Sequence, residues 1–374
     1  MLSPESFLDS LQAGGVRFFA GVPDSLLKQI CACITDRLDS EDHIITANEG
    51  AAIGLGIGYH IATGETPLVY MQNSGLGNVV NPLLSLASPE VYSIPMVLLI
   101  GWRGRPGIKD EPQHVHQGRV TEDMLGVMDI PVQVLGDDLK GAQANVDWAV
   151  SKAKDINGPV ALLVKKGTFD SYKMSIKSAA VPLEREEAII KIAESLEENA
   201  AVVCTTGMPS RELFEYRARS GARHETDFLT VGGMGHASQI AMGIALQKKD
   251  RPVYCIDGDG AALMHMGSLA ISGMSGANNF IHIIVNNGAH ESVGGQPTVG
   301  MQVNFPDIAR ACGYASAVRV KTAVEIQAAL ETARNVRGPA FIEILVKTGH
   351  RADIGRPTTT PVQNKTALMA FLKD

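Results

Sequence analysis

Short apolar runs alternate along the chain with longer stretches whose apolar residues recur at helical spacing. Eight such runs stand out, at residues 18–22, 67–72, 95–101, 159–165, 201–205, 253–257, 280–285 and 339–346. Apolar runs of this length, separated by helical stretches, are typical of buried parallel strands joined by crossover helices. We therefore predict an α/β protein built on doubly wound parallel sheets.

The alternation breaks once, at residues 171–184, which lack a clear period and contain a proline. With 374 residues the chain is long enough for two domains, so we predict domains at 1–170 and 185–348 with a linker between them. The tail, 349–374, is expected to be loop-like at first. It then ends in a short amphipathic helix around Leu368, which would cover the edge of a sheet.

Two polar clusters directly follow two of the apolar runs. They are Gly-Asp-Gly at 258–260 and Asn-Asn at 286–287, with 25 residues (261–285) between them. A single crossover helix is expected there, with an apolar face formed by Leu263, Met266, Leu269, Ile271 and Met274. Both strands of a parallel βαβ unit end at the same edge of the sheet, so Asp259 and Asn287 should meet at that edge.

A carboxylate and an amide oxygen at one edge of a sheet suit Mg²⁺, which prefers hard oxygen ligands. The flanking residues Gly258 and Gly260 allow the backbone to approach an ion closely. Gly-Asp-Gly by itself is a common turn, so the glycines alone decide nothing. The spacing of Asp259 and Asn287 between two strands, however, resembles the motif of thiamin diphosphate (ThDP) enzymes.

Glu49 follows Asn48 at the start of a stretch that contains Gly54, Gly56 and Gly58. Asn48 is expected to cap a helix, and Glu49 could simply be an acid in its first turn. A ThDP enzyme, however, needs a carboxyl group that faces N1′ of the aminopyrimidine. Burial in an apolar cleft favours the neutral form of such a carboxyl, which can then share a proton. Beside the Gly-Asp-Gly motif we favour this second interpretation.

A glycine-flanked turn at residues 230–236 carries Met234, which lies 25 residues before Asp259. In ThDP enzymes a bulky aliphatic side chain in such a turn supports the cofactor from below. The carbonyl group of Gly232 could accept a bond from the 4′-amino group. The alternative is that Met234 fills a gap in the core.

Four segments extend the similarity, at residues 20–28, 70–118, 286–298 and 356–365. Over nearly its full length the chain resembles the ThDP-dependent 2-keto-acid decarboxylases, and in particular the short, two-domain phosphonopyruvate decarboxylase family. The resemblance implies a pyrimidine-binding and a diphosphate-binding domain of the ThDP fold, without a middle domain. It also implies a homo-oligomer, at least a dimer, with the cofactor at a subunit interface.

The resemblance implies roles for individual residues. Glu49 would activate the cofactor, and Met234 would support it. The Mg²⁺ ligands would be Asp259, Asn287 and the carbonyl group of Ala289. The cofactor-binding set would be Glu49, Gly75, Gly207, Gly232, Met234, Asp259, Gly260, Ala261 and Asn287.

The resemblance also implies that Asp24 and His114 are active-site acid/base groups. One position departs from the family, because relatives with a middle domain carry a catalytic glutamate where this chain has Val293. The donor of the final proton therefore stays open between His114, His116 and Asp24.

Polar and basic residues in the segment after the run 95–101 are expected to bind an anionic substrate. The candidates are Arg103, Arg105, Lys109, Gln113 and His116. Arginine can grip a phosphonate with two parallel hydrogen bonds. The alternative is that these charges form ordinary surface pairs, such as Lys109 with Asp110 or Glu111. His114 and His116 alternate in what looks like an extended run, so their rings should point to opposite faces.

The implied reaction is the ThDP- and Mg²⁺-dependent decarboxylation of 3-phosphonopyruvate to phosphonoacetaldehyde and CO₂ in phosphonate biosynthesis. One alternative is the same chemistry on sulfopyruvate. A second alternative, of another class, is a ThDP-fold scaffold or regulatory subunit that has lost catalysis; the presence of Glu49, Asp259 and Asn287 argues against it.

Composition narrows the partners and the compartment. The net charge of −7, without a stripe of Lys and Arg, argues against a nucleic-acid partner. No apolar run reaches the roughly 18 residues of a membrane span. The five scattered cysteines are expected to be reduced, and residues 3–5 (Ser-Pro-Glu) look like a helix start and not a targeting signal. We therefore expect a cytoplasmic protein.

Overall fold

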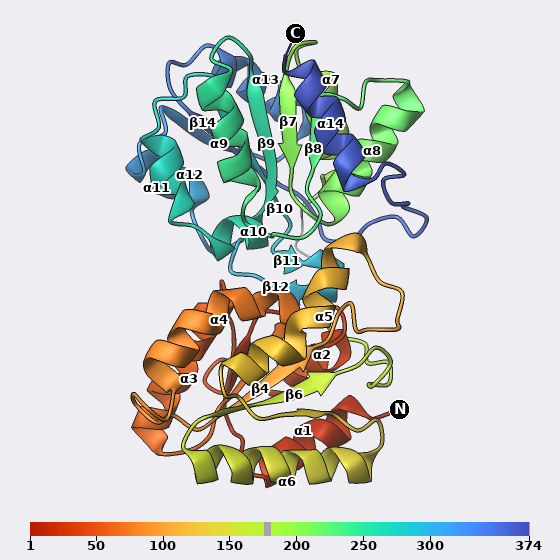
Figure 1. The fold of residues 1–374 in the computed structure, drawn as a ribbon. Helices are drawn as coiled ribbons and strands as arrows, with labels where there is room; N and C mark the ends of the chain where they lie inside the picture. The colour runs from red at the N-terminus through yellow and green to blue at the C-terminus, as the bar shows by residue number, and fades with distance from the viewer. Residues whose placement is uncertain (176–180, 374) are drawn as a thin grey trace. The chain divides into compact units, whose positions relative to one another are not determined.

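The computed structural model describes residues 1–175 and 181–373, and the chain divides into two compact units, Met1–Ile176 and Lys177–Asp374 (Figure 1). The predicted linker, 171–184, lies partly outside the described residues. Within the described ranges, no helix combines the length and the apolar character that crossing a bilayer requires.

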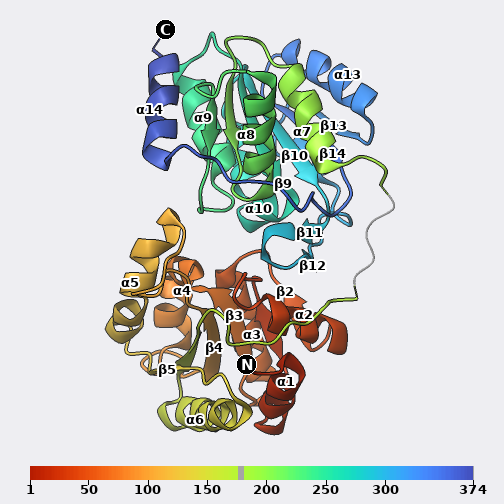
Figure 2. The same cartoon turned by 90° about the vertical axis from the view of Figure 1, so that its right-hand side faces the viewer.

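The first unit is built on a parallel sheet of six strands in the order β2-β1-β3-β4-β6-β5, counted over its described residues (Figure 2). The strands are β1 (Phe19–Gly21), β2 (His43–Ile45), β3 (Leu68–Gln72), β4 (Met96–Gly101), β5 (Val132–Val134) and β6 (Pro159–Val164). The helices are α1 (Pro4–Ala13), α2 (Lys28–Arg37), α3 (Glu49–Thr63), α4 (Leu76–Pro82), α5 (Pro112–Val127) and α6 (Leu139–Ile156), with the short turns η1 (Asn73–Gly75) and η2 (Leu83–Ala87).

Helices cover both faces of this first sheet, which explains why its central strands are apolar at nearly every position. Side chains of α1, α2 and α6 pack on one face with alternate residues of the strands. Those of α3, α4 and α5 pack on the other face. Such two-sided burial is the rule for parallel sheets, and it produces the continuous apolar runs seen in the sequence.

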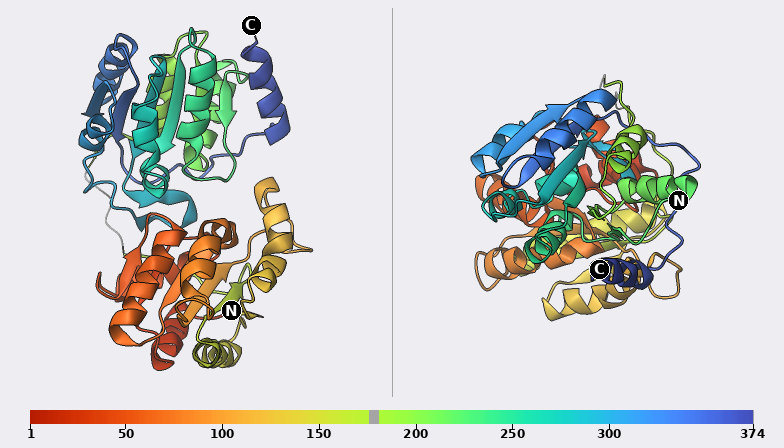
Figure 3. Two further views of the ribbon diagram at one scale, coloured as in Figure 1. Left: turned by 60° about the vertical axis from the view of Figure 1, so that its left-hand side comes forward. Right: turned by 90° about the horizontal axis from the view of Figure 1, so that it is seen from above.

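The second unit repeats this architecture, with a parallel sheet that helices cover on both faces (Figure 3). The order of its strands is β13-β14-β10-β9-β7-β8. The strands are β7 (Ala201–Cys204), β8 (Asp227–Leu229), β9 (Val253–Gly258), β10 (Phe280–Asn286), β13 (Ser316–Val320) and β14 (Ala340–Leu345), and a small antiparallel ribbon pairs β11 (Ala289–His290) with β12 (Gln296–Pro297). The helices are α7 (Arg185–Glu194), α8 (Met208–Ser220), α9 (Ala237–Gln247), α10 (Asp259–Met264), α11 (Ser268–Gly273), α12 (Phe305–Ala311), α13 (Ala323–Arg334) and α14 (Pro361–Phe371), with the short turn η3 (Glu291–Val293).

The C-terminal helix α14 covers β8 at the edge of the second sheet, as the sequence predicted (Figure 1). The amide of Asn364 fixes it there. Its Oδ1 accepts the Leu229 N–H at 3.0 Å, and its Nδ2 donates to the Asp227 carbonyl at 2.8 Å. Leu368 and Phe371 are buried below. The helix thus satisfies backbone groups at the edge while it completes the core.

Every one of the eight predicted strands is present, and the α/β fold class is confirmed. The prediction of a single crossover helix between β9 and β10 was wrong, because the segment forms two short helices, α10 and α11. Leu269 is buried, but Ile271 and Met274 are 62% and 78% exposed in the single chain. The backbone leaves the helical conformation at His265, with ψ at 48°, and this break rotates the second helix away from the expected face.

Candidate active site

Asp259 is the first residue of α10 and directly follows β9. Its side chain is buried, and its carboxylate accepts a hydrogen bond from the Thr298 hydroxyl. Burial raises the pKa of Asp259 to about 6, and hydrogen bonds from Thr298 and from the main chain of Asn287 and Gly260 oppose that rise. A carboxylate buried in this way is stabilised in its charged form by a bound cation.

Asn287 follows β10, which pairs in parallel with β9. Its Oδ1 accepts the Ala289 N–H at 3.1 Å, and its Nδ2 donates to Glu291 Oε2 at 3.1 Å. The structure therefore brings Asp259 and Asn287 to the ends of two neighbouring strands, where the spacing placed them. The carboxylate and the amide oxygen are donors of the kind that Mg²⁺ prefers, so the residues present fit a hard cation.

A buried polar network lies behind this edge, and the sequence motifs did not predict it. The Nδ2 of Asn286 donates to the Gly300 carbonyl at 2.8 Å and to Glu343 Oε1 at 2.7 Å. The other oxygen of Glu343 accepts Arg319 Nε at 2.6 Å, and Glu343 is fully buried. An acidic residue in the middle of the apolar strand β14 was the sequence signal, because a buried charge requires partners.

Gly300 shows how closely the loop after β12 approaches the carboxylate. A Cβ at this position would lie 2.6 Å from Asp259 Oδ2 and 2.9 Å from Asn286 Oδ1. The Gly300 N–H also donates to the Thr298 hydroxyl at 3.0 Å. Any larger residue would have to displace the loop or the carboxylate.

Beyond Asn287 the chain forms the β11–β12 ribbon and the short turn η3, which contains Val293. Glu291 ties this ribbon down, because its Oε2 accepts the Asn287 amide at 3.1 Å and the Gly349 N–H at 2.9 Å. Arg185 approaches the same carboxylate at 3.8 Å. Glu291 was not selected from the sequence.

The other candidate cofactor contacts of the second unit lie at the starts of its helices or just before them. Gly207 precedes α8 with φ at 103°, and Gly232 follows β8 with its N–H donating to Thr206 Oγ1 at 3.0 Å. Met234 is half-buried in the same turn. Gly260 and Ala261 occupy the first turn of α10 and are buried. These residues all follow the carboxyl ends of β7, β8 and β9.

Glu49 lies in the first unit, at the start of α3, and Asn48 caps that helix by accepting the Ala51 N–H at 2.9 Å. The predicted N-cap is confirmed. Glu49 is 4% exposed, and its Oε2 accepts Asn78 Nδ2 at 2.7 Å. A Cβ at Gly75 would lie 2.5 Å from Glu49 Oε1, so only glycine leaves room for the carboxyl group. The helix start and the close glycine together hold this carboxyl in one place.

Asp24 is fully buried in the segment after β1. Its oxygen atoms accept the Leu26 N–H at 2.8 Å, Gln72 Nε2 at 2.5 Å and, more weakly, the Ser25 hydroxyl at 3.4 Å. A Cβ at Gly101, at the end of β4, would collide with the carboxylate. The ends of β1, β3 and β4 therefore converge on Asp24.

The extended run expected around His114 and His116 was wrong, because both lie in α5. Pro112 occupies the first turn of this helix, where its fixed φ favours helix formation and its missing N–H costs nothing. His114 is buried, and its Nδ1 lies 3.1 Å from Asp110 Oδ1. His116 is exposed and pairs with Arg119 at 2.7 Å.

Asp110 pairs with Arg103 and not with Lys109. The Arg103 Nε donates to Asp110 Oδ2 at 2.8 Å, and its second amino group bonds to Oδ1. The remaining amino group of Arg103 donates to the Ser25 hydroxyl at 2.7 Å. The guanidinium group is thus engaged on both sides within its own unit.

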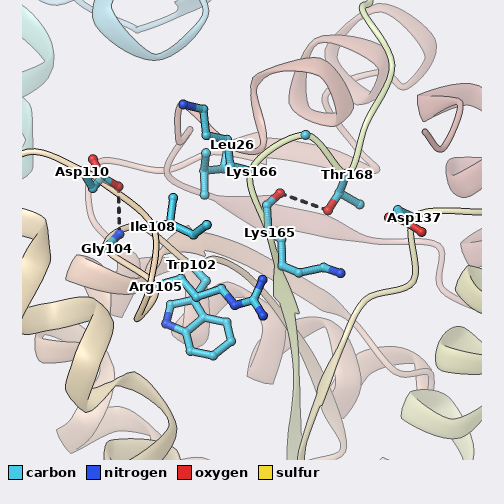
Figure 4. A pocket seen from close by; sticks show the side chains of 11 residues that line it. Leu26, Trp102, Gly104, Arg105, Ile108, Asp110, Asp137, Lys165, Lys166 and Thr168 are labelled. Atoms are coloured by element: carbon cyan, nitrogen blue, oxygen red, sulfur yellow. Dashed lines mark hydrogen bonds between the residues drawn. The ribbon is translucent and has the colours of Figure 1, made fainter.

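A cavity of about 270 Å³ lies beside this cluster in the first unit (Figure 4). It is lined by Leu26, Trp102, Gly104, Arg105, Ile108, Asp110, Asp137, Lys165, Lys166, Gly167 and Thr168. The Arg105 guanidinium lies over the Trp102 ring, 5.6 Å from its centroid. Lys165 and Lys166 directly follow β6 and were not selected from the sequence, although two lysines after a buried strand at the carboxyl edge of a sheet were a usable signal.

Comparison with known proteins identifies both units. Residues 4–125 match the model of the thiamine pyrophosphate enzyme N-terminal TPP binding domain, and residues 205–344 match the C-terminal TPP binding domain; thiamine pyrophosphate is another name for ThDP. Phosphonopyruvate decarboxylase from Streptomyces viridochromogenes is 33% identical, over 100% of this chain and 95% of its own. The phosphonopyruvate decarboxylase from Streptomyces hygroscopicus is 35% identical, over 96% and 92%. Sulfopyruvate decarboxylase from Methanosarcina acetivorans is 25% identical, over 92% of each chain.

Proposed function

The chain belongs to the phosphonopyruvate decarboxylase family of thiamine pyrophosphate enzymes, and from this premise we propose that it decarboxylates 3-phosphonopyruvate to phosphonoacetaldehyde and CO₂, a step of phosphonate biosynthesis. The observation that carries the proposal is the similarity to two phosphonopyruvate decarboxylases over more than nine-tenths of their length. The buried carboxyl groups of Glu49 and Asp259 support it, because they suit the two ends of the cofactor.

Mg²⁺ would be held by Asp259, Asn287 and the Ala289 carbonyl. Support comes from the buried carboxylate of Asp259 and from its place beside Asn287 at the ends of paired strands. Further cofactor contacts would come from Gly207, Gly232, Met234, Gly260 and Ala261, which lie at the same carboxyl edge of the second sheet.

When bound, ThDP supplies the electron sink that the departure of CO₂ requires. Glu49 would hold a proton against the aminopyrimidine ring, with Gly75 beside it leaving room for its carboxyl group. The tight contact between Gly75 and Glu49 Oε1, and the Asn78 bond to Oε2, support a single fixed position for this carboxyl. A fixed, buried acid is well placed for general acid–base work.

The phosphonate group of the substrate would bind in the cavity beside Arg105, with Lys165 and Lys166 adding positive charge. Lys109, Gln113 and His116 remain candidates for the same contact. For Gln113 the support is a buried Oε1 that has no hydrogen-bond partner within the described residues. The guanidinium group of Arg103 already donates hydrogen bonds to Asp110 and Ser25, which leaves the other basic residues for the phosphonate.

We propose that the protein is a homo-oligomer, at least a dimer, with the cofactor between subunits. Support comes from large apolar side chains that are exposed in the single chain on α3 and η2, two elements of the first unit that contact each other: Leu55, Ile61, Leu84 and Leu86. Exposed apolar side chains of this size become buried when subunits associate. A reducing, cytoplasmic compartment is supported by five free cysteines, four of them buried.

The test is CO₂ release by the purified protein with ThDP and Mg²⁺, comparing phosphonopyruvate, sulfopyruvate and pyruvate at equal concentration. We expect kcat/KM for phosphonopyruvate to exceed the others about a hundredfold, or ~2.7 kcal/mol of transition-state binding. The Glu49→Gln variant should lose turnover, whereas Glu41→Gln, an exposed acid of the same unit, should keep it.

A preference for sulfopyruvate would favour the second candidate, which the 25% identity to an archaeal sulfopyruvate decarboxylase motivates. Release of CO₂ from none of the three substrates would contradict the proposed function.

A further inference from the structure

The carboxylate of Asp110 joins two segments of the first unit. It accepts two hydrogen bonds from Arg103 and one from the Gly104 N–H at 2.8 Å. The Nδ1 of His114 lies 3.1 Å from the same carboxylate. The Asp110 side chain is only 14% exposed, so these contacts replace most of its hydration. They therefore fix the start of α5 against the segment that follows β4.

These contacts determine the protonation state of Asp110. Burial alone would raise its pKa, but the hydrogen bonds from Arg103, the Gly104 N–H and His114 lower the pKa well below its usual value. An ionised carboxylate can only accept hydrogen bonds. The Nδ1 of His114 must therefore carry a proton, which leaves Nε2 as the ring atom that can gain and lose one.

Arg103 extends the cluster toward Asp24. One of its amino groups donates to the Ser25 hydroxyl at 2.7 Å, and that hydroxyl lies 3.4 Å from Asp24 Oδ1. The resulting chain runs from Asp24 through Ser25 and Arg103 to Asp110 and His114. Both acid/base candidates of the first unit are therefore connected through one arginine–carboxylate pair.

We propose that Asp110 and Arg103 are positioning residues. They hold the ring of His114 so that Nε2 is the atom that gains and loses a proton, and they fix the position of Asp24 relative to that ring. This inference rests on the proposed function and refines it. Arg103 then positions the acid/base groups, and other residues bind the phosphonate.

The reaction requires a proton donor, which this arrangement can supply. Loss of CO₂ from a keto acid leaves a carbon atom that must gain one proton to become an aldehyde. His114, protonated on both nitrogens, would give the Nε2 proton to that carbon and return to the neutral ring with its proton on Nδ1. The ring then regains the proton from solvent. Asp110 accepts a hydrogen bond from Nδ1–H throughout and does not change its charge.

The charged groups around His114 set the expected pH behaviour. Burial lowers the pKa of His114, and Arg103 lowers it further, whereas Asp110 and Asp24 oppose the shift. Removing the charge of Asp110 should therefore lower the pKa of His114 still more. The alkaline limb of the kcat profile, where His114 loses the proton that it must donate, should move to lower pH in such a variant.

The first experiment compares Asp110→Asn with Asp123→Asn, an exposed acid on the same helix α5. We expect Asp110→Asn to lower kcat about tenfold to a hundredfold, with KM changed less than about threefold and the alkaline limb shifted to lower pH. Asp123→Asn should match the parent protein. Unchanged kcat and an unchanged pH profile in Asp110→Asn would overturn the proposal.

The second experiment separates a positioning role of Arg103 from contact with the phosphonate. Arg103→Lys keeps the charge but cannot make the two parallel bonds to Asp110. We expect kcat to fall by the same factor on phosphonopyruvate and on pyruvate, so the preference between them is kept. A selective rise in KM for phosphonopyruvate would show that Arg103 binds the anion and would refute this part.

A third measurement uses the parent protein itself, so it depends neither on enzyme activity nor on the folding of a variant. In the ¹⁵N spectrum of the parent protein, the neutral ring of His114 should show a protonated Nδ1 and an unprotonated Nε2. The opposite tautomer would contradict the proposal even if the enzyme is active. The expected tautomer in a protein that releases CO₂ from none of the substrates would instead mean that the positioning pair exists and the proposed function is wrong.

Discussion

In the second unit, Asp259 and Asn287 directly follow two paired strands, so the sheet itself places them. In the first unit, Asp24 and His114 lie on segments after β1 and β4, and the Arg103–Asp110 pair connects them. Backbone geometry builds the first arrangement, and long-range side-chain contacts build the second. A sequence motif is therefore sufficient to locate site residues that paired strands place, but not site residues that side-chain contacts place.

The comparison predicts that the largest single loss follows removal of a charge at the strand ends. Asp259→Asn removes the buried carboxylate from the proposed ion site while it keeps the size of the side chain. We expect loss of Mg²⁺-dependent ThDP binding and a fall in kcat/KM of about a thousandfold or more, comparable with removal of a central electrostatic contact. Isothermal titration with Mg²⁺ and ThDP, together with CO₂ release, measures both quantities.

Asp250→Asn is the matched control for this variant, because Asp250 is an exposed acid of the same unit. It should bind the cofactor as the parent protein does. Cofactor binding by Asp259→Asn at parental affinity would mean that the ends of β9 and β10 do not hold the ion.

The same contrast explains how much the sequence could predict. All eight long runs became strands, because a strand buried on both faces has to be apolar throughout. The strands β2, β5, β8 and β13 were not predicted. The first three have only three residues each, and in β13 the polar residues Ser316 and Arg319 interrupt the apolar run. The placement of Asp259 and Asn287 at the ends of two neighbouring strands followed from βαβ topology.

The acid/base cluster of the first unit could not be predicted in this way. The sequence around His114 suggested an extended run, but Pro112 starts a helix there. Nothing in the spacing of Arg103 and Asp110 fixes their side chains to each other, because a seven-residue separation across a loop has no repeating geometry. Such contacts depend on the packing of the surrounding fold, which a local pattern does not encode.

A smaller effect is expected one layer behind the strand ends of the second unit. Glu343→Gln leaves a single acceptor oxygen where Asn286 and Arg319 now each bond to one. One bond is lost and Asn286 becomes less firmly fixed, so apparent Mg²⁺ affinity should weaken about tenfold to a hundredfold, as for other outer-shell partners. Titration of Mg²⁺ in the presence of ThDP measures this affinity.

Glu331→Gln, an exposed acid on α13, provides the control and should change nothing. If Glu343→Gln keeps full affinity, the network behind β10 is a packing feature alone. The strand ends would then hold the ion without support, which would sharpen the contrast with the first unit.

The smallest effect is expected at the mouth of the cavity in the first unit, where Arg105 is exposed and lies on Trp102. Arg105→Ala should raise KM for phosphonopyruvate about tenfold, because one charge-assisted contact contributes roughly 1.5 kcal/mol. KM for pyruvate, which has no phosphonate, should change little, and Arg17→Ala, an exposed arginine of the same unit, should leave both constants unchanged. A steady-state comparison of KM for phosphonopyruvate and for pyruvate measures this difference.

An equal effect of Arg105→Ala on both substrates would mean that Arg105 supports the fold around Trp102 and that the anion binds elsewhere. A selective effect of Arg105→Ala, together with an Arg103→Lys variant that keeps the preference for phosphonopyruvate over pyruvate, would assign different roles to the two arginines. Arg103 would position the acid/base groups, and Arg105 would bind the substrate.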